Sequence, residues 1–373
     1  MTPKRKKKSS LGLIGKTIIS ANILAVILLL LSYLAPITDP AVFWPIAFVG
    51  LAYPALILTN VFFVIYWLLI RPKIALISVL AIIIGWKFVL SQIGFQESAP
   101  IETPKSSFSF IRVMTYNVHY FKKVDSLNNK LIKNQMLDII RREQPDIVCF
   151  QEFMSHASGE YNMEESIKEI LHSDYFYFLS SNPYDYERIG VAIFSKFPII
   201  DSGYILFSDV ERGNEAIYTD VEFNKKPFRI YNVHFQSIAF QPDDYKYLKD
   251  VEEINPDVQA SRRIGSRLKR AFIKRSEQVK VLKKHTEDCI LPFVVAGDFN
   301  DTPISYALNT MSRGLKNTFR EKGSGFGNTY NGDFPNFQID YILTTPDFEI
   351  KNYQIIKKKL SDHYAVQSDI ELK

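Results

Sequence analysis

The chain is poor in cysteine, with only Cys149 and Cys289 among its 373 residues. Two thiols cannot form the several cross-links that stabilise small secreted domains, so a disulfide-based scaffold is excluded. Cys149 lies within an apolar run, and the sequence therefore predicts a buried thiol at this position.

The second part of the chain has no excess of positive charge. Residues 1–104 carry nine Lys or Arg against three Asp or Glu, whereas residues 105–373 carry 36 against 37. The basic pI of about 8.8 therefore reflects the front of the chain. A domain that binds nucleic acid mainly through a large positive field is not indicated, because such a domain needs an excess of Lys and Arg.

Charged residues are nearly absent from three long apolar runs near the N-terminus. About 20 apolar residues span the hydrocarbon core of a bilayer. The runs therefore predict three transmembrane helices, at about 17–37, 43–70 and 74–95. Lys87 in the third run costs about 3 kcal/mol, which the Ile, Leu, Val and Phe residues around it outweigh at about 0.3–0.6 kcal/mol each. Pro45 and Pro54 are expected to kink the second helix.

A cleaved signal peptide is the alternative for the first run, but two apolar runs follow it and no small-residue cleavage site is evident. Residues 1–16 form a basic tail, and the loop Arg71-Pro-Lys73 is also basic, whereas the loop near Asp39 has no basic residue. The positive-inside rule then places the tail and the Arg71 loop in the cytoplasm. We expect a multi-pass protein of the inner (plasma) membrane, with the lipid bilayer as a partner and the remainder of the chain on the periplasmic or extracytoplasmic side.

Beyond a polar linker at 97–107, residues 108–373 are predicted to form the catalytic domain. Apolar segments with strand-like alternation predominate there. The expected strands are 110–118, 146–152, 175–179, 190–196, 199–207, 216–223, 228–235, 293–296, 338–344 and 365–370, and the expected helices are 127–142, 163–171 and 258–285. Many strands with a few helices between them predict sheets packed face to face with helices outside, a layered α/β sandwich.

Six of the apolar segments have polar residues suited to metal or proton chemistry at or beside their ends. These residues are Asn117, Glu152, His234, Asp298 with Asn300, Asp340, and Asp362 with His363. Alone, the stretch Gly297-Asp-Phe-Asn300 is more readily an Asp/Asn turn after a strand. Strand alternation would also place Asp298 and Asn300 on the same side, where they could orient a water molecule. Six such ends together are hard to obtain by chance, and they indicate one site.

The order of these motifs resembles the endonuclease/exonuclease/phosphatase superfamily, which includes pancreatic deoxyribonuclease. The matching motifs are Met114-Thr-Tyr-Asn-Val-His119, Phe150-Gln-Glu152, Gly190-Val-Ala-Ile-Phe-Ser195, Asn232-Val-His-Phe235, Gly297-Asp-Phe-Asn300, Ile339-Asp-Tyr-Ile342 and Ser361-Asp-His363. The resemblance covers about 108–373. It implies a four-layered α/β sandwich, a divalent metal, Mg²⁺ (or Mn²⁺), and hydrolysis of phosphodiester or phosphomonoester bonds.

The resemblance also implies roles for single residues. Metal ligands would be Glu152, Asn117 and Asp362, which fits the preference of Mg²⁺ for oxygen. Catalytic residues would be His363, Asp340, Asp298, Asn300, His234 and Glu187. Among them, Asp340 would orient His363, and Glu187 would pair with His234. His119 stands where some members of the superfamily carry an acidic metal-site residue, so its role is open.

The predicted helix at 258–285 carries ten Lys or Arg and one acidic residue between Ser261 and Thr286. Its basic side chains either attract phosphates of nucleic acid or lipid headgroups, or form a solvated outer face. The substrate is accordingly expected to be a phosphate ester, nucleic acid or phospholipid. A nuclease-type activity is the leading hypothesis. The first alternative is a sphingomyelinase-like phosphodiesterase or phosphatase that acts on lipids or their headgroups. The second alternative is an inactive binding module on the same fold. No feature indicates a protein partner.

Overall fold

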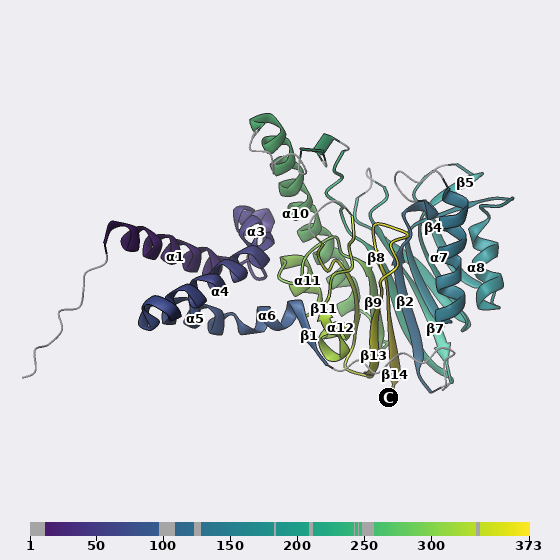
Figure 1. Cartoon of the computed structure of the whole chain (residues 1–373). Helices are drawn as coiled ribbons and strands as arrows, with labels where there is room; N and C mark the ends of the chain where they lie inside the picture. Colours follow the sequence, from purple (N-terminus) through teal and green to yellow (C-terminus); the bar gives the residue numbers. More distant parts are fainter. Residues whose placement is uncertain are drawn as a thin grey trace, which may run out of the picture.

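Two six-stranded β-sheets packed face to face form the centre of the molecule in the computed structural model (Figure 1). The structure describes residues 12–96, 109–122, 128–182, 184–208, 212–241, 243–244, 246–247, 257–332 and 336–373. Helices cover both outer faces of the sheet pair, which confirms the predicted four-layered α/β sandwich.

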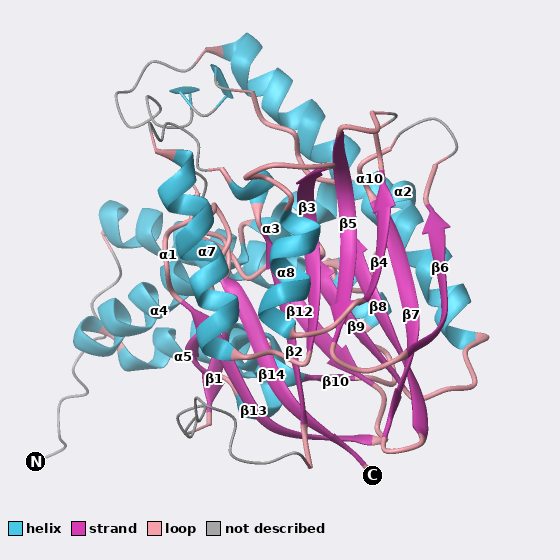
Figure 2. Cartoon of the chain, turned by 90° about the vertical axis from the view of Figure 1, so that its right-hand side faces the viewer, coloured by secondary structure: helices cyan, strands magenta, loops and turns pink. Residues whose placement is uncertain are grey.

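Sheet I has the strand order β13-β14-β2-β3-β5-β4. Its strands are β2 (Ile111–Asn117), β3 (Ile147–His156), β4 (Tyr175–Ser180), β5 (Glu187–Ser195), β13 (Phe348–Ile356) and β14 (Ala365–Leu372). Helices α7 (Asn129–Glu143) and α8 (Met163–Leu171) pack on its outer face, in front of the sheet in Figure 2. The sequence did not predict β13, because Glu349 and Lys351 alternate outward on this edge strand and resemble a polar loop.

Sheet II has the strand order β10-β12-β9-β8-β7-β6. Its strands are β6 (Ile199–Leu206), β7 (Glu215–Phe223), β8 (Lys226–His234), β9 (Phe293–Asp298), β10 (Lys316–Asn317) and β12 (Asp340–Thr344). Helices α10 (Val258–Glu287) and α11 (Tyr306–Met311) cover its outer face, and α12 (Thr318–Lys322) follows β10. The helix predicted at 258–285 is therefore confirmed as α10.

Alternate residues of one strand contact the two sides of its sheet. In β3, Ile147 and Cys149 point into the layer between the sheets, whereas Val148 and Phe150 pack under α7 and α8. The predicted burial of Cys149 is confirmed.

One buried asparagine joins the two sheets by directional hydrogen bonds. Asn232 of β8 donates through Nδ2 to Phe150 O (2.8 Å) and Ala192 O (2.9 Å) in sheet I, and its Oδ1 accepts from Gln151 Nε2 (2.6 Å). Asn232 and Gln151 are fully buried. Since an apolar core has no preferred direction, these bonds fix how far one sheet is shifted along the other.

The N-terminal apolar region contains α1 (Leu13–Ser32), α2 (Pro40–Phe43), α3 (Pro45–Leu51), α4 (Tyr53–Ile70), α5 (Pro72–Ile84) and α6 (Trp86–Gln92). Within the part of the chain that the structure describes, α1 and α4 are long and apolar enough to cross a membrane. The pair α5 and α6, bent by 65°, would make a third span if counted as one. The described residues therefore contain two to three candidate spans, and the three transmembrane helices stay a prediction.

The predicted second and third spans differ in detail from the structure. The run 43–70 is divided because a proline stands in the first turn of α3 and of α4, where proline begins a helix. The run 74–95 bends at Gly85, where an added Cβ would lie 2.0 Å from the Tyr33 ring, and it ends in β1 (Ile93–Phe95). The linker at 97–107 and residues 1–11 of the basic tail lie outside the described residues.

The N-terminal helices bury polar side chains and expose apolar ones. Asn22 of α1 donates to Ser78 Oγ of α5 (2.7 Å), and Asn60 of α4 donates to Ala25 O of α1 (3.1 Å). Leu58 and Leu69, by contrast, are 69% and 83% exposed. This distribution is the reverse of that in a water-soluble bundle and suits helices surrounded by lipid.

The N-terminal region also packs against the sandwich. Phe48 of α3 makes an edge-to-face contact with Phe272 of α10, with ring centroids 5.2 Å apart. Asp39, at the N-terminus of α2, accepts hydrogen bonds from Ser276 and Lys280 of α10. β1 pairs with β11 (Ser324–Phe326), a short strand that the sequence did not predict.

Replacing the inter-sheet asparagine should destabilise the sandwich. Asn232→Ala removes three hydrogen bonds from a fully buried position, those to Phe150 O and Ala192 O and the one from Gln151 Nε2, which should cost about 3 kcal/mol. We expect the midpoint of heat unfolding, followed by circular dichroism on the whole chain in detergent, to fall by about 5–10 °C. Ser202→Ala, at an exposed position of β6, is the control. An unchanged midpoint for Asn232→Ala would show that these bonds do not hold the sheets in register.

Candidate active site

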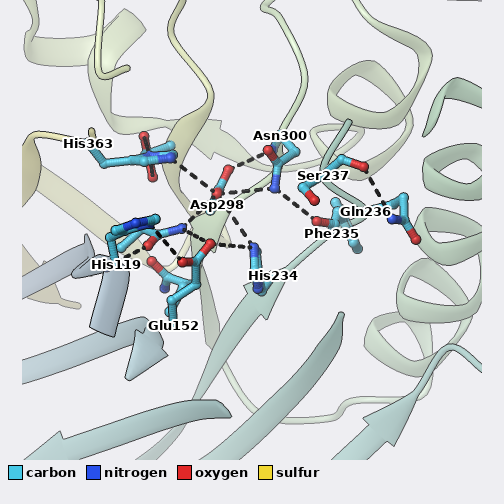
Figure 3. Close-up of polar contacts among 12 residues, drawn as sticks. His119, Glu152, His234, Phe235, Gln236, Ser237, Asp298, Asn300 and His363 are labelled. Carbon is cyan, nitrogen blue, oxygen red and sulfur yellow. Dashed lines mark hydrogen bonds and ion pairs between the residues drawn. The ribbon is translucent and has the colours of Figure 1, made fainter. Parts of the chain in front are cut away.

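Both sheets contribute polar side chains to one shared edge. β2 with β3, and β8 with β9, are parallel pairs, so Asn117 and His234 reach this edge at the ends of their strands. β12 is antiparallel to β9, which places Asp340, its first residue, opposite Asp298, the last residue of β9. His363 enters the same edge from the turn before β14. The predicted gathering of strand ends is therefore observed (Figure 3).

A buried carboxylate orients His363. His363 Nδ1 donates to the Asp340 carboxylate, at 3.0 Å from Oδ2 and 3.1 Å from Oδ1. Burial works against the imidazolium, but the negative charges of Asp340 and Asp298 outweigh it and hold the pKa of His363 well above its usual value. The ring nitrogen Nε2 is left facing the cavity side, 3.7 Å from Asp298 Oδ2.

Asp298 lies between two histidines. Its Oδ2 is 3.7 Å from His363 Nε2 and also 3.7 Å from His234 Nε2. Burial raises the pKa of Asp298 to about 6, with the opposing charge of His363 limiting the rise. Gly297 precedes it with φ +147°, and a Cβ there would lie 2.1 Å from Val233 O, so only glycine allows β8 to approach so closely.

Asn300 holds Asp298 in place, although the geometry differs from the sequence argument. β9 ends at Asp298, and Asn300 lies beyond it with φ +52°. This left-handed turn, and not strand alternation, brings the two side chains together. Asn300 N and Nδ2 donate to the two carboxylate oxygens of Asp298, at 2.7 and 3.1 Å, and Nδ2 also donates to Phe235 O.

A second acidic group lies beside this cluster. Glu152 occupies a bulge in β3 with φ +49°, and it contacts His119 Nδ1 at 3.2 Å. Burial alone would raise the pKa of Glu152, but the His119 hydrogen bond and the charge of His234 lower it to about 2. Asp362 lies near the same ring nitrogen, 3.9 Å from His119 Nδ1. His119, whose role the sequence left open, thus directs Nδ1 toward two carboxylates.

The residues fit a divalent cation in two places. Glu152, Asp362 and the Asn117 side chain offer the oxygen atoms that Mg²⁺ prefers. The hydrogen bond to Glu152, helped by the charge of Asp362, raises the pKa of His119, so the structure itself places a cationic group where these carboxylates meet. Asn117 donates through Nδ2 to Glu152 and Asp298, and its Oδ1 accepts from His119 N. Its oxygen would face the carboxylates only after its amide turns over.

Asp298, Asp340 and His363 form the other group, since one ligand atom of each lies within 4.8 Å of the others. In this group His363 Nδ1 is already hydrogen-bonded to Asp340, and an imidazolium does not bind a metal. The carboxylates at His119 are therefore the better site. His234 Nε2 is buried and has no hydrogen-bond partner among the described residues, which marks a position for a further ligand such as an oxyanion.

The predicted pairing of Glu187 with His234 is not what the structure shows. Glu187 begins β5 opposite His156, the last residue of β3, and it contacts His156 Nε2 at 3.1 Å. The antiparallel register of β3 and β5 sets this pairing, and a short motif could not reveal it. The sequence also missed Arg275, which is 1% exposed and contacts Asp301 at 3.1 Å beside the cavity.

The site opens into a cavity of about 380 Å³. Its polar wall includes Glu152, Asp298, Asn300, Asp362 and His363. Three consecutive residues with positive φ, His119 to Phe121, form a left-handed turn at its rim. Strained backbone gathered at polar cavities is a common property of functional sites.

Removing the negative charge of Glu152 should change the titration of His119. In Glu152→Gln the imidazolium loses its hydrogen-bonded anion, so the pKa of His119 should fall toward its usual value. Imidazole NMR titration of the chelator-treated whole chain measures this, and adding Mg²⁺ to the wild type should lower the same pKa. Glu187→Gln, which alters the separate pair with His156, is the matched control and should leave His119 unchanged. A His119 pKa that responds to neither Glu152→Gln nor Mg²⁺ would contradict this cation site.

Comparisons with known proteins agree with this geometry. A family model described as the endonuclease/exonuclease/phosphatase family matches residues 114–363, and a second, described as domain of unknown function (DUF8431), matches residues 15–92. No curated protein gives a match.

Solved structures share the fold at low sequence identity. The endonuclease/exonuclease/phosphatase from Beutenbergia cavernae is 19% identical, with a TM-score of 0.52 over 71% of this chain and 72% of that one. The protein of the same description from Bacteroides vulgatus is 20% identical, with a TM-score of 0.52 over 71% and 99%. A family member from Bacteroides thetaiotaomicron is 15% identical, with a TM-score of 0.51 over 71% and 98%. With its family model covering two thirds of its length, the chain belongs to the endonuclease/exonuclease/phosphatase family.

Proposed function

We propose that this chain is a membrane-attached, divalent-metal-dependent hydrolase of phosphate esters. One observation carries the proposal: Asp298, which lines the cavity, lies between His363, oriented by Asp340, and His234, whose Nε2 has no hydrogen-bond partner among the described residues. A phosphate ester needs donors for its oxygens and an acceptor for a water proton, and these groups supply both.

Mg²⁺ (or Mn²⁺) is the proposed cofactor, and Glu152 and Asp362, with the turned amide of Asn117, would hold it. Such an ion would neutralise charge on the phosphate and polarise its oxygen atoms. The low pKa of Glu152 keeps this carboxylate ionised at neutral pH, as a metal ligand must be.

The remaining residues perform the proton chemistry. Asp298 is the acceptor for the proton of the attacking water, because its pKa of about 6 leaves it ionised yet basic at neutral pH. Asn300 orients this carboxylate by donating to both of its oxygens. His363, kept protonated by Asp340, donates from Nε2 to a phosphate oxygen. His234 Nε2 donates to a second oxygen or to the leaving group.

Catalysis fits the site better than a role in binding alone. Burying Asp298, Asp340 and His363 together costs stability, since ionised groups lose their hydration. A binding module could replace such a cluster with neutral donors and avoid that cost. The cluster is intact here, together with its positioning contacts from Asn300 and Asn117.

Activity should require both the metal and the acid–histidine pair. For p-nitrophenyl phosphate or bis(p-nitrophenyl) phosphate, we expect His363→Ala and Asp340→Asn each to lower kcat by about 10²–10⁴-fold. EDTA should abolish turnover, and excess Mg²⁺ or Mn²⁺ should restore it. His156→Ala is the matched control, because His156 pairs with Glu187 away from the cavity, and it should stay within about threefold of the wild type. Full activity in EDTA, or a His363→Ala variant as active as the wild type, would refute the proposal.

We propose further that α1, α4 and the bent pair α5–α6 anchor the chain in the inner (plasma) membrane. Their buried asparagines and exposed leucines favour lipid surroundings, and three crossings would place the catalytic domain opposite the basic N-terminus, outside the cytoplasm. A reporter that is active only outside the cytoplasm, fused after Lys373, should therefore be active. A reporter active only in the cytoplasm would exclude this topology.

A further inference from the structure

The cavity at the active site has an apolar side that the chemistry described above does not use. Besides its polar residues, it is lined by Ile238 and Phe240 after β8, by Leu268 and Phe272 of α10, and by Leu51 of α3. Its volume of about 380 Å³ lies in the range of ligand pockets and far exceeds the roughly 30 Å³ that one water molecule occupies. A phosphate group would fill only part of it.

This apolar wall is completed by the N-terminal region. Ala47, Phe48 and Leu51 of α3 pack against the part of α10 that carries Leu268 and Phe272. Leu51 stands two residues before Tyr53, where the candidate span α4 begins. The surface that lines the active site therefore continues directly into a helix that suits the bilayer.

Exposed aromatic residues of the N-terminal region would suit the surface of a membrane. Val42 and Phe43 of α2 are 83% and 53% exposed, and Trp44 follows them. Trp86, at the start of α6, is also exposed. Tryptophan is enriched where lipid headgroups meet the hydrocarbon core. In Figure 1, α3, which follows Trp44, and α6, which begins at Trp86, lie on the side of the N-terminal region that faces the sandwich.

Basic residues of α10 line a groove next to the cavity. A groove of about 330 Å³, lined by Arg263, Arg267, Arg270 and Lys274, shares residues 237–239 with the active-site cavity. Asp244 pairs with two of these arginines, at 2.6 and 3.2 Å. Lys269 lies 4.7 Å above the Trp44 ring. Positive charge at a membrane surface attracts anionic headgroups.

We infer that the substrate is a membrane lipid that carries the phosphate ester in its headgroup, with the phosphate at Asp298 and His363 and the hydrocarbon part against Leu51, Leu268 and Phe272. This inference rests on the proposed hydrolase function. The reaction is hydrolysis: the water oxygen bonds to phosphorus, the ester P–O bond breaks, and the leaving oxygen takes up a proton while Asp298 accepts one from water. No oxidant or reductant is needed.

Nucleic acid is the competing substrate. The basic groove would attract its phosphates as well, but the apolar side chains of the cavity do not complement a polar and charged sugar–phosphate backbone. The near balance of acidic and basic residues over 105–373 also disfavours a long anionic polymer.

The test uses the whole chain in vesicles of phosphatidylcholine, alone or doped with phosphatidic acid, phosphatidylglycerol or a polyprenyl phosphate. Release of phosphate or phosphorylated headgroup is measured beside hydrolysis of p-nitrophenyl phosphate, bis(p-nitrophenyl) phosphate and an oligonucleotide. We expect at least one lipid to be cleaved, and the lipid that is cleaved identifies a monoester or a diester and its hydrocarbon part.

Leu51→Gln, which makes the apolar wall polar, should lower the ratio of lipid to soluble-ester hydrolysis by about tenfold or more. Leu51→Trp is a second test in case Leu51→Gln disturbs the packing of α3. It keeps the wall apolar but fills part of the cavity, and it should lower the ratio of lipid to soluble-ester hydrolysis similarly. Leu58→Gln, on the exposed side of α4, is the control and should leave the ratio unchanged.

Hydrolysis of soluble esters without cleavage of any lipid would overturn the inference and leave the proposed function intact. An equal loss on both substrate types in both Leu51 variants, or faster cleavage of the oligonucleotide than of every lipid, would also overturn it. If no ester is hydrolysed at all, the proposed function is wrong and the inference falls with it.

Discussion

The active site depends on the register between two sheets, and the buried Asn232 sets that register. Asn117, Glu152 and His363 come from sheet I, whereas His234, Asp298 and Asp340 come from sheet II. The apolar layer between the sheets supplies most of the stabilisation but tolerates small shifts, because burial has no direction. The hydrogen bonds from Asn232 to Phe150 of β3 and Ala192 of β5 do not tolerate such shifts, because they depend on direction. The Asp340–His363 bond, which itself crosses from sheet II to sheet I, can form only in that one register.

The same edge concentrates features that oppose folding. Asp298 and Asp340 are each 1% exposed and lie near one another, and Glu152, Asn300 and the turn at His119 have left-handed backbone. Each such feature costs on the order of 1–3 kcal/mol. His119 and His363 offset part of the cost by placing positive charge among the carboxylates. A metal ion at Glu152, or a phosphate at His234 Nε2, which has no hydrogen-bond partner among the described residues, would offset more. A site of this kind is most stable when it is occupied.

The sequence predicted the sandwich and the gathering of strand ends, because both follow from local patterns: alternating apolar residues, and polar residues where the alternation stops. It could not predict contacts that tertiary register decides. Glu187 lies opposite His156 through the pairing of β3 with β5, and Asn300 reaches Asp298 through a left-handed turn. The prolines of the second apolar run indicated kinks but not that α3 would leave the run and pack on α10. Leu51 could therefore not be recognised as a cavity residue from its place in an apolar run.

Helix α10 explains how an anchor and a catalytic edge can act as one unit. Its apolar stripe has two partners: Val279 and Leu282 pack on sheet II, whereas Leu268 and Phe272 pack against α3 and line the cavity. The sequence offered phosphate attraction or a solvated outer face for the basic side of this helix, and the structure places part of that side in a groove beside the active site. This helix of 30 residues contacts sheet II and the apolar region and lines the cavity, so it links the three. Under the proposed membrane attachment, the N-terminal region does more than hold the chain near a surface, because Leu51 of α3 forms part of one wall of the active-site cavity.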